Sequence, residues 1–324
     1  MEHSNLRLHV SRLVSVAIGV SLLFLVACWF DDESPTQPGA TPPPFAPRFG
    51  GTPSFESPVR MTVTVGGDLL VSDVRRGAIV VVDPETLKPS QSLQIDGEPM
   101  AIAVLQDRIF VGNVTGRAIE IFDAGGGRQG SIGAGTVDYP SDLAVDVGQG
   151  LLFVVDEGSR QVKVFDQQGT PRGTISGPGT GPSGLVTPIA IAVDEDRQEV
   201  FVSDYGRDGG PASVKVFDYA GLLLSEISGE GSCGSLGCSG GFSRPQGIAL
   251  DDEGRLYLAD ALLAQILIYD RATGELIGTL GGRTEGPPYL RLPTDVVIGA
   301  GGDLFVTNNR ARTVDVYRRG AGGS

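Results

Sequence analysis

Histidine is almost absent from this sequence. Its only two copies among 324 residues are His3 and His9, and both lie in an N-terminal segment that we expect to be removed. The rest of the chain then has no imidazole, which excludes catalysis by a Ser-His-Asp triad and zinc sites built on histidine ligands.

Basic side chains are also scarce. The sequence has 25 Lys and Arg against 39 Asp and Glu, which gives a formal net charge of −14 at pH 7. A nucleic-acid-binding protein needs a basic stripe that displaces counterions from phosphates, and no such stripe is visible in the sequence. We therefore expect no nucleic-acid partner, and anionic lipid surfaces are disfavoured for the same reason.

Cysteine is limited to Cys28, Cys233 and Cys238, whose spacing matches neither a CxxCH haem motif nor a two-pair zinc knuckle. Glycine and proline, in contrast, are abundant, with 48 and 21 copies. This composition predicts many short elements separated by tight turns. We expect no long helices, no cofactor and no catalytic residues.

Residues 1–27 are typical of a signal peptide. Arg7 and Arg12 precede an apolar run from Leu13 to Ala27, which is too short to span a bilayer comfortably. The run ends in Leu-Val-Ala-Cys28, which resembles the lipobox of bacterial lipoproteins. The resemblance implies acylation of the Cys28 thiol, a membrane anchor, and a place in the bacterial cell envelope, either periplasmic or on the outer surface. The alternative is a chance cysteine in an ordinary signal peptide or a short membrane anchor.

Residues 28–44 are interpreted as a tether. An acidic run at residues 31–33 is followed by five prolines, and such a segment cannot form a core. The sequence is thereby divided into a signal peptide (residues 1–27), a tether (28–44) and one large domain (45–320).

Within that domain one pattern recurs six times. Each copy has a proline, two variable residues, a short apolar strand, a second strand ending in Asp or Asn, and a third strand that in most copies ends in Asp. A fourth strand follows in the clearest copy, residues 245–280. The β-branched and aromatic content of these segments is typical of buried or half-buried strands. The copies begin at Pro58, Pro99, Pro140, Pro188, Pro245 and Pro293.

Repeats of 41 to 57 residues with four strands each predict the blades of a β-propeller, because one blade buries its faces only by stacking on neighbours. The fold class is therefore all-β, a six-bladed propeller of four-stranded antiparallel blades. Residues 48–317 resemble the NHL-repeat family, and the first two copies are also similar to YVTN-type (YncE-like) repeats. The resemblance implies the fold and leaves the function open.

The sixth copy has no fourth strand of its own. Residues 46–58, however, match the fourth-strand and linker segment at residues 279–288. We therefore predict that the N-terminal strand of the domain completes the last blade and closes the ring.

Antiparallel strands place the second-to-third turns and the blade-to-blade linkers at one end of the ring, and the long insertions fall there. Such loops on a rigid scaffold are where binding usually resides, although solvated loops without a role are an equal alternative. The candidate binding residues are Tyr205, Arg207, Asp208, Phe242 and Arg244. Cys233 and Cys238 lie in the same linker region, and in an oxidising compartment they predict a loop disulfide.

Two further sets of polar residues lie near the same end. The Asp or Asn that closes each second strand is interpreted as a structural residue that accepts backbone N–H bonds in its own turn. The second position after each proline varies, and Arg60, Asp142 and Asp295 occupy it in three copies. These three form either a small polar binding site at the channel mouth or a structural ion pair.

Several enzyme families share the propeller fold, and their site residues can be compared with those of this chain. Amidating-lyase and streptogramin-lyase propellers are excluded because their chemistry needs histidine. Gluconolactonase-like propellers hold a divalent metal on oxygen ligands, including a Glu two residues before the first proline, where this chain has Glu56. The residues directly after the prolines do not supply the other ligands, and one oxygen ligand is insufficient for Ca²⁺. Those residues are Val59, Met100, Ser141, Ile189, Gln246 and Thr294.

Together these features predict a non-catalytic, lipid-anchored propeller that binds a protein or a small ligand in the bacterial cell envelope. A divalent-metal-dependent lactonase or hydrolase of the gluconolactonase type is the alternative. A glycan-binding module ranks below it, because the loops offer few aromatic platforms, namely Tyr205, Phe242 and Tyr289.

Overall fold

The computed structural model describes residues 45–48, 54–179, 181–206, 211–230, 232–234, 237–239, 241–282 and 290–320. All of them lie in the second of two compact units, Gly39–Ser324. In these described ranges, no helix has both the length and the apolar character that crossing a membrane requires.

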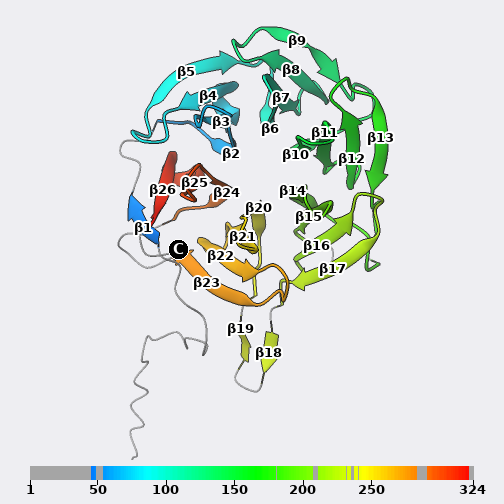
Figure 1. The fold of residues 1–324 in the computed structure, drawn as a ribbon, viewed down its shortest axis with the longest axis vertical. Coiled ribbons are helices and arrows are strands. Elements are labelled where there is room, and N and C mark those ends of the chain that lie inside the picture. The colour runs from blue at the N-terminus through cyan, green and yellow to red at the C-terminus, as the bar shows by residue number, and fades with distance from the viewer. Residues whose placement is uncertain are drawn as a thin grey trace, which may run out of the picture. The chain divides into compact units, whose positions relative to one another are not determined.

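Six four-stranded antiparallel sheets form a ring of blades (Figure 1). Blade 1 has β2 (Pro58–Val63), β3 (Leu69–Asp73), β4 (Ala78–Val82) and β5 (Pro89–Gln94). Blade 2 has β6 (Pro99–Leu105), β7 (Arg108–Asn113), β8 (Ala118–Asp123) and β9 (Arg128–Ile132). Blade 3 has β10 (Pro140–Asp146), β11 (Leu151–Asp156), β12 (Gln161–Asp166) and β13 (Pro171–Ile175).

The second half of the ring repeats this order. Blade 4 has β14 (Pro188–Asp194), β15 (Glu199–Asp204), β16 (Ser213–Asp218) and β17 (Leu223–Ser228). Blade 5 has β20 (Pro245–Leu250), β21 (Arg255–Asp260), β22 (Gln265–Asp270) and β23 (Leu276–Gly281). Blade 6 has β24 (Pro293–Ile298), β25 (Leu304–Asn308), β26 (Thr313–Arg319) and β1 (Phe45–Arg48). The predicted fold class is confirmed.

Three short elements lie outside the blade strands. The 3-10 helices η1 (Val74–Arg76) and η2 (Asn309–Ala311) form the second-to-third turns of blades 1 and 6. The linker into blade 5 contains a two-stranded hairpin, β18 (Ser232–Gly234) with β19 (Gly237–Ser239), that the sequence pattern did not predict.

Every inner strand begins at the proline of its repeat. Proline has no N–H to donate to a ladder, so the start of a strand is a position that tolerates it. In each blade the pairing of the inner strand with the second strand then shifts just after the proline. Such a bulge re-aims a side chain, and it does so here at the residues nearest the centre of the ring.

The hydrophobic core is divided among the seams between blades. Each of the six buried apolar clusters contains residues from two adjacent blades. In the seam between blades 6 and 1, for example, Phe305 and Val316 pack with Leu69 and Val71. Because every blade face is covered by a neighbour, the ring has no exposed apolar end.

The N-terminal strand completes blade 6, as predicted. β1 pairs antiparallel with β26, with Phe45 opposite Arg319 and Arg48 opposite Val316. The Phe45 ring also contacts Tyr257 edge-on, with 6.4 Å between the ring centroids. β1 therefore covers the outer edge of the last blade and joins the two ends of the domain.

Deleting residues 45–52 is expected to destabilise the domain, because it removes β1 and uncovers β26. With about 2–4 °C of melting temperature lost per kcal/mol in a domain of this size, we expect the melting temperature to fall by more than about 5 °C. Differential scanning calorimetry measures the change. Deleting residues 36–43, an equally long piece of the tether, is the matched control and should leave the melt unchanged; equal melts for both deletions would contradict the closure.

Candidate functional site

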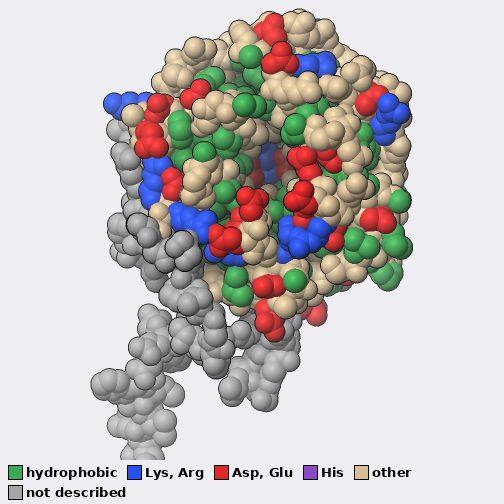
Figure 2. Space-filling view, viewed as in Figure 1, with side chains coloured by type: hydrophobic (Ala, Val, Ile, Leu, Met, Phe, Trp, Pro, Cys, Tyr) green, Lys and Arg blue, Asp and Glu red, His purple; other side chains and the backbone are tan. Residues whose placement is uncertain are grey.

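The two ends of the ring carry different sets of turns and linkers. We call the end with the second-to-third turns and the blade-to-blade linkers the linker face, and the end with the first-to-second and third-to-fourth turns the opposite face. The ring is hollowed at its centre, and acidic side chains border the hollow on the face shown in Figure 2.

Beneath the linker face, buried carboxylates hold the linkers to the blades. Asp73, at the end of β3, accepts the backbone N–H groups of Glu56 and Ser57 at 2.8 and 2.7 Å. Asp204 accepts those of Val186 and Thr187 at 2.7 and 2.8 Å. In each case the donors are the two residues before the proline of the same blade, so the carboxylate fixes the entry of the inner strand.

The same arrangement recurs at Asp156 and Asp260, and Asn308 accepts one such bond from the N–H of Arg291 at 2.7 Å. Asn113 differs: its amide donates to the Asp96 carbonyl at 2.9 Å. The structural interpretation of these residues stands, but their main partner is the incoming linker, with bonds to their own turns added in some blades.

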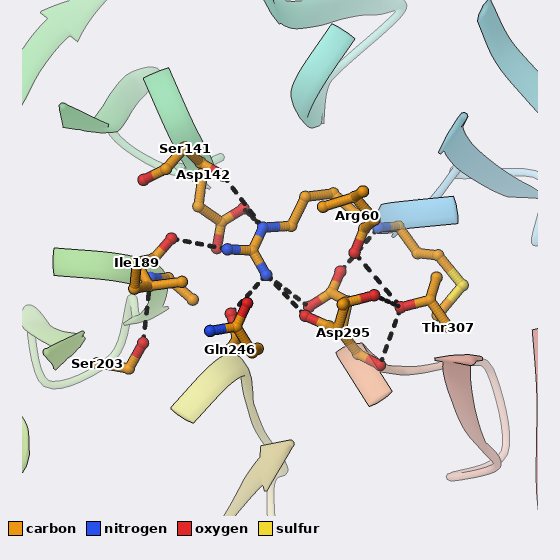
Figure 3. Close-up of polar contacts among 12 residues, drawn as sticks. Arg60, Ser141, Asp142, Ile189, Ser203, Gln246, Asp295 and Thr307 are labelled. Atoms are coloured by element: carbon orange, nitrogen blue, oxygen red, sulfur yellow. Dashed lines mark hydrogen bonds and ion pairs between the residues drawn. The ribbon is translucent and has the colours of Figure 1, made fainter. Parts of the chain in front are cut away.

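Arg60 on β2 reaches across the centre of the ring (Figure 3). Its Nε donates to the Ser141 carbonyl at 3.1 Å, and its Nη2 donates to the Ile189 carbonyl at 2.7 Å. Its Nη1 donates to the carbonyls of Gln246 and Thr294 at 2.5 and 2.9 Å. One side chain of blade 1 is thus bonded to the backbone of blades 3, 4, 5 and 6, and it is only 3% exposed.

Two carboxylates flank this guanidinium. Asp142 Oδ1 lies 3.4 Å from Arg60 Nε, and Asp295 Oδ1 lies 3.8 Å from Nη1. Each carboxylate also accepts a backbone N–H from the next blade, Asp142 from Ile191 at 2.9 Å and Asp295 from Met61 at 2.7 Å. We call Arg60, Asp142 and Asp295, with the four bonded carbonyls, the central cluster.

The central cluster holds more negative charge than its cation balances. Burial raises the pKa of Asp142, with Arg60 acting in the opposite direction. Burial raises the pKa of Asp295 to about 7, and repulsion from Asp142 adds to the effect while Arg60 opposes it. One guanidinium faces two buried carboxyl groups, so a proton on Asp295 relieves the excess charge near neutral pH.

The structure brings together the three residues that the sequence placed at the channel mouth. Of the two interpretations left open, it favours the structural ion cluster, because Arg60, Asp142 and Asp295 are all buried and bonded to one another or to backbone. The four carbonyl partners could not be predicted from the sequence, although they belong to residues directly after prolines.

The residues at the centre do not fit a divalent metal. The carbonyls that point to the axis accept bonds from Arg60, whose positive charge would repel a cation. Glu56 is exposed on the linker face, and its backbone N–H is bonded to Asp73. Within the described part of the chain no group of three His, Cys, Asp or Glu residues is arranged to hold a metal ion.

The candidate loop residues are placed differently from one another. Arg244 is exposed, and its guanidinium lies over the half-buried Tyr205 ring at 5.9 Å from the centroid. Phe242 is 3% exposed and packs edge-on against Tyr269 in the core of blade 5, so its ring is not offered to a ligand. Arg207 and Asp208 lie outside the described residues, as does Cys28.

The backbone register bears on the predicted disulfide. Cys233 on β18 is directly opposite Cys238 on β19. Residues opposite one another in an antiparallel pair have Cα atoms about 4.5–5.5 Å apart, and disulfides span about 4.4–6.8 Å. The backbone is therefore compatible with a bridge, which remains a prediction.

Comparison with known proteins supports the repeat type over part of the chain. No family model matches the sequence. The human E3 ubiquitin-protein ligase NHLRC1 is 27% identical over 138 residues, which cover 43% of this chain and 31% of that protein. The rat protein of the same name is 28% identical over 129 residues, or 40% and 28% of the two chains. The match spans less than a third of the length of these relatives.

Solved structures agree over a larger share of the chain. Hydrazine synthase of Kuenenia stuttgartiensis has a TM-score of 0.62 at 15% identity and covers 84% of this chain and 98% of its own. A nidogen/laminin complex has a TM-score of 0.62 at 18% identity and covers 77% and 88%. The chain is an NHL-repeat-like six-bladed β-propeller. Because the two solved structures are only 15% and 18% identical in sequence, they establish the fold of this NHL-repeat-like propeller and nothing about its function.

Replacing Arg60 by methionine is expected to destabilise the propeller strongly. Removing one partner of a buried ion pair costs about 3–5 kcal/mol, and here four carbonyls lose their donor as well. Urea denaturation of Arg60→Met should therefore show a loss of that order. Arg128→Met, at an arginine whose side chain is 56% exposed, is the control and should change the unfolding free energy little.

A rescue experiment tests the charge balance of the central cluster. Adding Asp142→Asn and Asp295→Asn to Arg60→Met should recover part of the lost stability. An Arg60→Met variant as stable as the parent would refute the central cluster.

Asp295→Asn is expected to change how stability depends on pH. The pKa of Asp295 is higher in the folded chain, about 7, than the ordinary 3.8, so the folded state holds this proton more tightly than the unfolded state. The contribution of Asp295 to stability is then fully present below about pH 4 and is lost as pH rises to about 7.

The variant lacks this loss, so its unfolding free energy should rise relative to the parent between pH 4.5 and pH 8. At about 1.4 kcal/mol per unit of pKa over the roughly 2.5 units between pH 4.5 and a pKa of about 7, we expect a relative gain on the order of 3 kcal/mol. Urea titrations at both pH values measure it, and parallel pH profiles for parent and variant would show that Asp295 is ionised normally.

Proposed function

We propose that this propeller is a non-catalytic binding scaffold that recognises a protein in the bacterial cell envelope through its linker face. The observation that carries the proposal is the central cluster, because the place where a propeller would hold a small ligand or metal is filled by Arg60 and its partners. A partner would then bind through loops, either on the linker face or on the opposite face.

The linker face is the better candidate of the two. It carries the long linkers at residues 176–187, 229–244 and 282–292, on a ring whose blades are fixed by buried carboxylates. Long loops on a rigid scaffold are suited to recognition. One structural neighbour, the nidogen/laminin complex, is itself an assembly of two proteins, which is compatible with protein binding by this fold.

The envelope location is part of the proposal and rests on the sequence. A signal peptide ending at residue 27 and an acylated Cys28 would anchor the propeller to a membrane through the tether of residues 28–44. β1 enters the ring with Phe45 opposite Arg319, at the end of β26 that lies at the opposite face. Phe45, the residue that follows the proposed tether, therefore lies on the side away from the linker face.

A metal-dependent lactonase is not favoured. Such an enzyme needs several oxygen ligands free to coordinate the cation, and at the centre of this ring the described carbonyls and carboxylates bind Arg60 or backbone N–H groups. Glu56 is exposed and belongs to no such group.

Two exposed apolar residues allow the binding face to be tested in cells. Leu262 lies in a second-to-third turn on the linker face and is 50% exposed, whereas Val65 lies in a first-to-second turn on the opposite face and is 91% exposed. A photoreactive amino acid is placed at either position of the full chain, and the irradiated membrane fraction is examined by mass spectrometry. We expect one dominant protein adduct from position 262 and none from position 65.

Fractionation of the same cells tests the anchor, because Cys28→Ser should move the chain from the membrane fraction to the soluble fraction.

The crosslinking results test the binding face. Adducts from position 65 alone, or the same diffuse set from both positions, would refute binding through the linker face.

A further inference from the structure

Five exposed arginines lie on the linker face where blade 6 meets blade 1. The second-to-third turns of these two blades supply Arg75, Arg76, Arg310 and Arg312, and the linker into blade 6 supplies Arg291. We call these five residues the arginine patch.

Hydrogen bonds hold the segments of the arginine patch side by side. The Arg310 N–H donates to the Arg291 carbonyl at 3.1 Å, and the Ser54 N–H donates to the Arg312 carbonyl at 3.2 Å. Arg76 Nη2 donates to the Ser54 carbonyl at 3.0 Å. The ring closure thus joins residues from the two ends of the sequence on one surface.

Much of the positive charge of the patch is not neutralised. Arg76 Nε lies 3.6 Å from the buried Asp73. Among the described residues, no carboxylate lies within 4 Å of the charged nitrogens of Arg75, Arg310 or Arg312. The neighbouring segments add little charge by their sequence. Residues 49–53 have no charged side chain, residues 283–289 have one Arg and one Glu, and residues 54–57 have one carboxylate, that of the exposed Glu56.

The acidic side chains of the opposite face have a local structural role, which no described contact gives to Arg75, Arg310 or Arg312. Aspartates at the third-to-fourth turns accept N–H groups of their own turns, as Asp83 does from Thr86 at 2.7 Å. Backbone N–H donors hold the pKa of Asp83, Asp123 and Asp270 below its ordinary value. The same bonding recurs at Asp166 and Asp218, and also at Asp251 in a first-to-second turn. Turn formation therefore accounts for these six aspartates of the opposite face.

The side chains of Arg75, Arg310 and Arg312 have no comparable role in their turns. Those turns close through backbone bonds, from the Gly77 N–H to the Val74 carbonyl and from the Arg312 N–H to the Asn309 carbonyl, both at 3.1 Å. In blade 5 the corresponding turn is made of Ala261, Leu262, Leu263 and Ala264 without any charge. The positive charge at the seam is therefore not a requirement of the fold.

We propose that the arginine patch binds an acidic segment, rich in Asp and Glu, of the partner protein. The proposal rests on the proposed role of the linker face in protein binding and specifies the chemistry that this face recognises. Guanidinium groups present a planar set of donors that matches carboxylates in bidentate pairs, so a group of arginines suits a segment with several carboxylates.

A local acidic peptide fits better than an extended polyanion. The whole chain carries −14, and its opposite face is rich in carboxylates, so a membrane or a long nucleic acid would be repelled by most of the surface. A short segment can lie on the patch alone. Binding of a nucleic acid in place of the acidic peptide is one result that the experiment below can give.

The probe is a fluorescein-labelled peptide of ten glutamates, and its binding to the full chain is followed by fluorescence anisotropy. The test variant combines Arg75→Gln, Arg310→Gln and Arg312→Gln and leaves Arg76 and Arg291, which have other bonds, in place. Glutamine suits position 312, where the backbone has φ of 62°, because Gln106 and Gln198 adopt φ of 60° and 54° in this chain.

The control variant combines Arg117→Gln, Arg128→Gln and Arg160→Gln. It removes the same number of positive charges from exposed sites outside the patch. With exposed ion pairs contributing up to about 1 kcal/mol each, three of them should make binding about tenfold or more weaker in the patch variant. The control should bind within about twofold of the parent, and added salt should weaken parent binding.

The results separate this proposal from the proposed function. If the peptide does not bind, or if both variants lose affinity equally, the arginine patch is not a site for acidic segments, while an adduct at position 262 would still establish the linker face as a binding surface. Single-stranded RNA that binds more tightly than the peptide and is lost in the patch variant would overturn the proposal in favour of a nucleic-acid ligand. Loss in the patch variant alone supports it, whatever the adducts show.

Discussion

The seam between blades 6 and 1 is the contact on which the rest of the structure depends. Six blades cover one another only if the last packs on the first, and here that contact combines the apolar cluster around Phe305 and Leu69 with the pairing of β1 and β26. The same closure brings Arg60 of blade 1 to the Thr294 carbonyl of blade 6. An open ring would lose the central cluster and the arginine patch together.

Acidic residues serve three separate structural purposes in this ring, and their surroundings determine which. At the ends of second strands they are buried and accept linker N–H groups, as Asp73 does. At the third-to-fourth turns they are exposed and accept turn N–H groups, as Asp83 does. Near the axis, Asp142 and Asp295 join adjacent inner strands and balance Arg60. The large negative charge of the chain is thus in good part a consequence of its architecture.

The sequence was sufficient for the parts of the structure that repeat. The prolines and the strand-ending Asp and Asn residues recur with each blade, so the strands, the blade number and the closing strand followed from them. The central carbonyls did not, because a backbone group leaves no mark on residue identity. The arginine patch was missed because Arg75 and Arg310 are far apart in the sequence. Phe242 lies in the linker as predicted, but its burial could not be predicted because it depends on Tyr269 in another strand.

The central guanidinium also limits where recognition can evolve in this propeller. A metal ion at the axis can be lost or exchanged without altering the chain, whereas Arg60 is covalently part of blade 1 and bonds to four other blades. Ligands that displaced it would have to compensate four carbonyls and two carboxylates in a site almost closed to water. Changes in specificity are less costly in the linkers and turns, where the side chains of Arg75, Arg310 and Arg312 form no ion pair with a described residue. Recognition at the rim is therefore the expected result of a centre that is already filled.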